Sequence, residues 1–222
     1  MKLKTEKGFV GLAAGTFALS LTAGALAFSA FQPAPFSNVE YGAHAAWVSQ
    51  AETVAEQVFE ADLVARVQAV DRAEARHLWH PMPEGVQKVD GRGTFAFTDT
   101  QVEVLEVYQG KAEVGDRLWV MQTGADLRTH EGKTARLEAA EDPLYERGDE
   151  MVLFLIDISG DSVHAPNREL FRTVNPAGRY LVEGGLVGRI APHEHAKAQI
   201  LDLGALEDEI RVAVAERAAL ER

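Results

Sequence analysis

Hydrophobic residues of this chain fall into short runs separated by polar segments that contain glycine and proline. One run, residues 151–158, is almost entirely apolar and predicts a central strand buried on both faces. β-Branched residues spaced among polar ones predict further strands. The predicted strands span residues 63–71, 95–108, 117–122, 151–158, 170–174 and 179–190. Between them, residues 73–92 and 124–148 are expected to form two long polar loops.

Two local signals refine the strand prediction. The apolar phase of residues 95–108 reverses between Val104 and Leu105, and side chains of a strand alternate in direction. Such a reversal predicts a bulge or a bend where a barrel turns a corner. Gly184 and Gly185 interrupt the last run and can adopt positive φ, so we expect a tight hairpin there.

Helical patterns flank the strands on both sides. A short helix is predicted to begin at Ser49, with Glu52 completing a capping box and Val54 and Val58 forming its apolar stripe. A second helix is predicted after Asp202, its N-cap. Its apolar residues keep a spacing of three and four: Leu203, Leu206, Ile210 and Val214.

The N-terminal 31 residues predict export. Residues 8–31 carry no charge and follow Lys2, Lys4 and Lys7, which is the pattern of a cleaved signal peptide or of one N-terminal transmembrane anchor. Small residues at positions 25 and 27 favour cleavage before Phe28, whereas the length of the run favours the anchor. We expect residues 32–48 to be a linker, residues 49–192 a β domain with its leading helix, and residues 193–222 a C-terminal helix packed on that domain.

Composition narrows the class of protein. The formal net charge is −12, so an exported body of this charge is repelled by nucleic acid and by anionic lipid, and we expect membrane contact only through the N-terminal segment. The chain has no cysteine, so stability must come from packing rather than from disulfides. These properties favour an extracytoplasmic bacterial protein with one packed domain.

Four short motifs lie at the predicted strand ends and turns: Ala61-Asp62 before a strand, Tyr108-Gln109-Gly110 at the end of the next, the Gly115-Asp116 turn, and Gly148 leading into the apolar run. Together they resemble the netrin-like module of the tissue inhibitors of metalloproteinases. The resemblance implies a mainly β, OB-like barrel of five to six strands with flanking helices. The absence of cysteine separates this chain from inhibition through an N-terminal cysteine. An immunoglobulin-like β-sandwich is the alternative fold.

The one serine motif of note is Gly160-Asp161-Ser162-Val163, which looks like the nucleophile motif of GDSL hydrolases, with His164 at a matching distance from Asp161. In that family the serine and histidine blocks lie near opposite ends of the chain, whereas here they overlap in one short segment. We therefore interpret the segment as a hairpin turn and predict no catalytic residue and no enzyme activity.

Metal sites are not predicted either. His77 with His80, and His193 with His195, could each offer two imidazoles, but zinc sites need three or four ligands. The acids between Glu138 and Glu150 lack EF-hand spacing and have arginines among them, which favours a solvated loop. No cofactor is expected.

The sequence thus favours a non-enzymatic binding domain of the bacterial envelope, secreted or tethered, whose ligand is a protein or another envelope component. The residues proposed for binding are Trp79, His77 and His80, because a Leu-Trp pair in a proline- and glycine-bearing loop can be offered to a partner. Two other functions remain open: an extracellular GDSL-like serine hydrolase, and a structural envelope protein that self-associates through the C-terminal helix.

Overall fold

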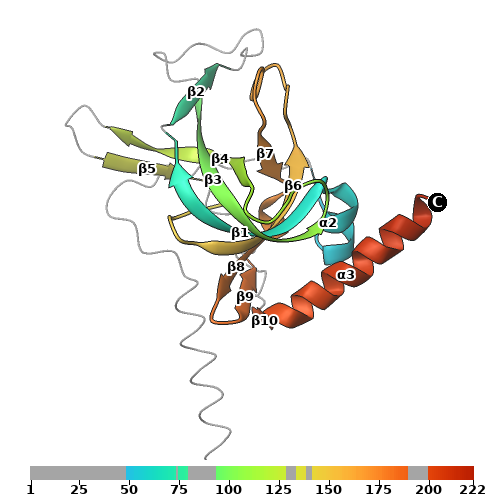
Figure 1. The fold of residues 1–222 in the computed structure, drawn as a ribbon. Coiled ribbons are helices and arrows are strands. Elements are labelled where there is room, and N and C mark those ends of the chain that lie inside the picture. The colour runs from blue at the N-terminus through green and yellow to red at the C-terminus, as the bar shows by residue number, and fades with distance from the viewer. Residues whose placement is uncertain (1–48, 74, 80–93, 129–133, 139–141, 190–199) are drawn as a thin grey trace, which may run out of the picture. The chain divides into compact units, whose positions relative to one another are not determined.

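A computed structural model describes residues 49–73, 75–79, 94–128, 134–138, 142–189 and 200–222, which all belong to one compact unit (Figure 1). The helices in these ranges are α2 (Val54–Glu60) and α3 (Leu203–Leu220), with a 3₁₀ turn at Pro176–Gly178. Neither α-helix is long and apolar enough to cross a membrane. The predicted signal peptide or anchor lies outside the described residues.

Five strands close into a mixed barrel. They are β1 (Leu63–Arg72), β3 (Thr94–Gln109), β4 (Arg117–Arg128), β7 (Phe171–Thr173) and β6 (Glu150–Asp157), in that spatial order, and β6 pairs back to β1. All neighbours are antiparallel except β4 and β7, which are parallel. The closed ring is OB-like and confirms the predicted barrel over the sandwich.

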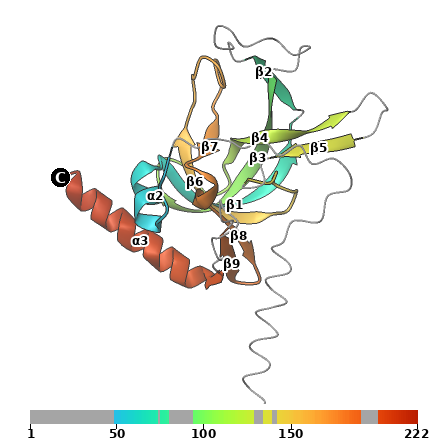
Figure 2. The ribbon, with the colours of Figure 1, turned by 180° about the vertical axis from the view of Figure 1, so that it is seen from behind.

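Additional strands extend from the ring. β2 (Arg76–Trp79) pairs with β3, and β5 (Thr134–Glu138) pairs with β4. β8 (Arg179–Glu183) pairs with β6 and is followed by β9 (Leu186–Arg189) and β10 (Ile200–Asp202). In both ribbon views β2 and the hairpin between β6 and β7 rise from the upper end of the barrel, whereas β8 and β9 lie below it (Figures 1 and 2).

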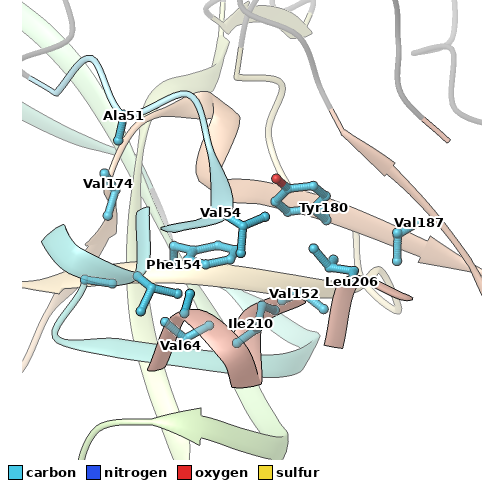
Figure 3. Close-up of a cluster of buried hydrophobic side chains, with 13 residues drawn as sticks. Ala51, Val54, Val64, Val152, Phe154, Val174, Tyr180, Val187, Leu206 and Ile210 are labelled. Carbon is cyan, nitrogen blue, oxygen red and sulfur yellow. The ribbon is translucent and has the colours of Figure 1, made fainter. Parts of the chain in front are cut away.

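β6 is buried on both faces, as its unbroken apolar sequence predicted. Met151, Leu153 and Leu155 point into the barrel. Val152 and Phe154 point outward, into a second core that includes α2 and α3. Figure 3 shows Phe154 in this outer core with Val54 and Ile210. The barrel therefore has an interior core and a helix-covered exterior core that share one strand.

The predicted bulge lies in β3. Its neighbour β1 pairs Arg66 with Glu106 and Val67 with Val104, which leaves Leu105 without a partner. As a result Val104 and Val107, three positions apart, both pack in the barrel interior. The additional residue turns the strand so that one apolar face continues around the barrel.

The first helix begins four residues later than predicted. Its N-cap is Thr53, whose side chain accepts from the Glu56 backbone N–H at 3.2 Å, while the Glu56 carboxylate accepts from the Thr53 N–H at 2.9 Å. Ser49 and Glu52 offered the same spacing of residue types. Tertiary contact decided between them, because the carbonyl of Ala51 accepts from the Asn175 amide, which holds residues 49–51 against the barrel.

Both segments predicted as long loops contain strands, so that prediction is corrected. Residues 76–79 form β2, and β4 continues through Gly124 to Arg128 before the chain returns as β5. These strands extend beyond the closed ring, and charged residues such as Arg76, Asp126 and Arg136 lie within them. They consequently lack the apolar rhythm that identified the barrel strands.

The C-terminal part largely follows the sequence prediction. Asp202 caps α3 by accepting from the Ala205 N–H at 3.2 Å, and Leu206 and Ile210 are fully buried. Gly184 and Gly185 have φ of 59° and 83° and form the hairpin between β8 and β9. The short strand β10, just before α3, was not predicted.

The backbone at Gly110 lies close to the start of β1, whereas the backbone at Gly115 has open space around it. It has φ of +102°, and a Cβ there would lie 2.6 Å from the carbonyl oxygen of Asp62. Gly115 has φ of +93° and open space around it. We expect Gly115→Ala to cost about 1 kcal/mol of unfolding free energy through backbone strain alone.

Gly110→Ala should cost about 1 to 3 kcal/mol more, because strand β1 must also move. Urea unfolding of the two variants beside the unmodified chain measures the difference. Equal losses would show that the contact between Gly110 and β1 does not constrain the barrel.

Candidate functional site

The upper end of the barrel is held together by one buried carboxylate, Asp99 of β3. Its side chain is fully buried. Arg76 of β2 donates to both of its oxygens, at 2.6 and 2.8 Å, and Arg168 from the segment between β6 and β7 donates to Oδ2. Two guanidinium groups from segments far apart in sequence thus converge on one acid, which offsets the cost of burying it.

Further contacts join the same segments. Arg76 also donates to the His164 carbonyl at 3.0 Å, and the Phe97 and His164 rings meet edge to face with centroids 5.5 Å apart. β2, β3 and the β6–β7 segment are therefore fixed to one another. Sequence reasoning did not find Asp99, because a single aspartate within a strand pattern gives no signal of its burial.

The residues proposed for binding lie beside this cluster in the chain. His77 and Trp79 belong to β2, where their backbones pair with Ala96 and Thr94 of β3. They stand on a paired strand and not in a loop. His80 lies outside the described residues, as do His193 and His195.

The Asp161 to His164 segment is a turn capped by its own side chains. Asp161 Oδ1 accepts from the backbone N–H groups of Val163 and His164, at 2.9 and 2.8 Å, and lies 3.0 Å from His164 Nδ1. These bonds, the His164 backbone first, lower the pKa of Asp161. Ser162 is exposed in the same turn. The spacing of aspartate and histidine thus has a local structural explanation.

The acid-rich segment before β6 is only partly solvated, which corrects the predicted solvated loop. Asp142 is 2% exposed and forms an ion pair with Arg179, 4% exposed, at 3.3 Å. Arg179 also lies 4.5 Å from the centre of the Tyr145 ring, and Gln122 accepts from the Tyr145 N–H at 2.9 Å. This segment closes the barrel interior, to whose core Tyr145 belongs.

Outside the barrel the same segment is exposed and ion-paired. Arg136 bonds Asp126 at 2.8 Å and Glu146 at 2.5 Å, as the arginines among the acids suggested. The bond from Arg136 holds the pKa of Asp126 below its usual value. Within the described ranges no three histidine or acidic side chains gather closely enough to hold a metal ion.

A groove of about 1030 Å³ lies where β1 begins and β3 ends, beside the C-terminal half of α3. Its apolar lining includes Leu63, Leu118, Phe171 and Val214. Arg217 of α3 donates to the carbonyls of Val58 and Ala61, both at 2.8 Å. These bonds fix the helical wall of the groove to the end of α2, so the groove is preformed.

Comparison with known proteins identifies no family for this chain. No protein-family model matches the chain, and no curated protein matches it. The chain resembles known proteins in its fold alone, which is a five-stranded, mixed, OB-like barrel with additional strands and flanking helices. Because OB-like barrels serve many functions, the surfaces of this barrel must carry the functional argument.

Replacing Asp99 should loosen the upper end of the barrel. Asp99→Asn leaves Arg76 and Arg168 without a counter-charge, and we expect a loss of roughly 2 to 3 kcal/mol. Both arginines are partly exposed, which keeps the loss below that of a fully buried pair. Hydrogen exchange of residues 158–170 should accelerate more than that of β6. Asp208→Asn, which breaks an exposed ion pair on α3, is the control. It should change neither the stability nor the hydrogen exchange of residues 158–170.

A partly buried tyrosine, Tyr108, and a fully buried one, Tyr145, allow a matched test of hydrogen bonding. Tyr108 donates to Glu207 at 2.8 Å, whereas the Tyr145 hydroxyl is buried with no hydrogen-bond partner among the described residues. We expect Tyr108→Phe to cost about 1 kcal/mol and Tyr145→Phe to be neutral or stabilising.

Burial also raises the pKa of both phenols, so the unfolded chain loses these protons first as pH rises. Stability should therefore fall above a pH of about 10, and less steeply in either variant. Denaturant titrations at neutral and alkaline pH measure both effects. A large loss in Tyr145→Phe at neutral pH would mean that its hydroxyl is bonded.

Proposed function

We propose that the protein is a non-enzymatic binding domain of the bacterial envelope, exported and then secreted or tethered by its N-terminal segment. Its ligand is a protein or another envelope component. The fold supports a binding role because small barrels commonly use one end or face for ligands. The motifs that resemble netrin-like modules agree with this role, and the negative charge disfavours nucleic acid.

The observation that carries the proposal is the convergence on Asp99. Three segments at one end of the barrel are held by the buried carboxylate of Asp99 and its two partly exposed arginines, although they extend beyond the hydrophobic core. A surface ordered before binding loses less conformational entropy when a ligand arrives. The upper end is therefore suited to recognition, and Trp79 and His77, which belong to β2, are its proposed binding residues.

Crosslinking capture with the full chain tests this function. The unmodified protein should recover a specific envelope or secreted ligand, and Trp79→Ala should reduce that recovery by about tenfold, as expected when a central aromatic anchor is removed. Leu220→Ala, which removes an apolar side chain that is 74% exposed on α3, is the control and should capture normally.

Two results would contradict the proposal at different levels. Capture that survives Trp79→Ala would place the binding surface elsewhere on the barrel. Ester hydrolysis by the purified chain that disappears in Ser162→Ala would show an enzyme and overturn the non-enzymatic function.

A further inference from the structure

The groove beside α3 is a second surface, separate from the upper end of the barrel. β3 connects the two: its first residue, Thr94, pairs with Trp79, and its last, Gln109, lines the groove. A volume of about 1030 Å³ is at the upper end of the range of ligand pockets and gives room for a short peptide segment.

The charges of the groove have one dominant sign. Its lining includes five acidic side chains, all exposed, and two basic ones. Of the two basic residues, Arg217 is already bonded to two carbonyls and to Glu221 at 2.9 Å, while Lys111 is exposed. The acidic residues are Asp62, Asp116, Asp157, Glu169 and Glu221. A ligand that carries several positive charges complements this lining.

The acids of the groove do not gather at one point. No three of them are close enough together to hold a metal ion, a statement that covers the described ranges. Between them lie apolar residues, including the buried Leu63 and the half-buried Leu118 and Phe171. A complementary ligand is therefore extended, with positive and apolar groups along its length.

We propose that this groove binds an extended basic peptide segment in which lysine or arginine alternates with apolar residues. In an extended chain successive side chains point to opposite sides, so alternate positions can reach the acidic rim while the others face the apolar floor. Arg217 holds the helical wall of the groove in place, so the domain does not need to rearrange when such a ligand binds. A second copy of this chain is disfavoured as the occupant because both copies carry a net charge of −12.

Binding can be measured with the full chain in a neutral detergent and a short fluorescent peptide of alternating lysine and valine. Fluorescence anisotropy should show saturable binding that weakens as salt is added. A glutamate and valine peptide should not bind, and a lysine and glycine peptide should bind more weakly, because it lacks the apolar groups.

Two adjacent residues of α3 provide the matched variants. Ala218 and Ala219 are both exposed, but only Ala218 lines the groove. Ala218→Lys should weaken peptide binding by about tenfold, whereas Ala219→Lys, with the same change of charge, should leave it within about twofold. Glu169→Lys in the groove and Glu183→Lys on the β8–β9 hairpin form a second pair with the same expectation.

Trp79→Ala should bind the peptide normally, which separates this inference from the proposed function of the upper end. The proposal is overturned if the unmodified chain does not bind the peptide at about 1 mM, or if Ala219→Lys weakens binding as much as Ala218→Lys. Equal binding of the lysine and glycine peptide would also contradict it. So would light scattering that shows a dimer broken by Ala218→Lys, because the occupant would then be a second copy.

Discussion

The burial of β6 on both faces is the constraint on which the rest of the structure depends. Met151, Leu153 and Leu155 complete the barrel interior, and Val152 and Phe154 require cover on the other side. Burying one large apolar side chain contributes about 1.5 to 3 kcal/mol, so α2 and α3 are needed parts of the domain. In a chain without cysteine this shared packing takes the place of disulfides.

Charged side chains organise the regions that the two apolar cores do not reach. Asp99 joins β2 and the β6–β7 segment to the barrel, and the pair of Asp142 and Arg179 closes the barrel interior. Buried ion pairs contribute little net stability, but each is satisfied in only one arrangement. Their effect here is to select the position of the extending segments.

Two surfaces with different chemistry follow from this arrangement. The upper end is ordered by two arginines that converge on the buried Asp99, whereas the groove combines exposed acids with an apolar floor beside a fixed helical wall. Contacts within the domain hold both surfaces in place. An OB-like ring does not specify what it binds, so the chemistry of these two surfaces is the basis for assigning ligands.

Local sequence determined much of the architecture. The apolar run of β6, the reversal at Leu105, the two glycines after β8 and the cap at Asp202 each act through neighbouring residues, and each was predicted. The start of α2, the strands β2 and β5, the burial of Asp99 and Asp142, and the groove depended on tertiary structure. The physical reason is that hydrophobic periodicity records only which face of an element meets a core. Which polar strand pairs at an edge, and which acid meets a distant arginine, is decided when the barrel closes.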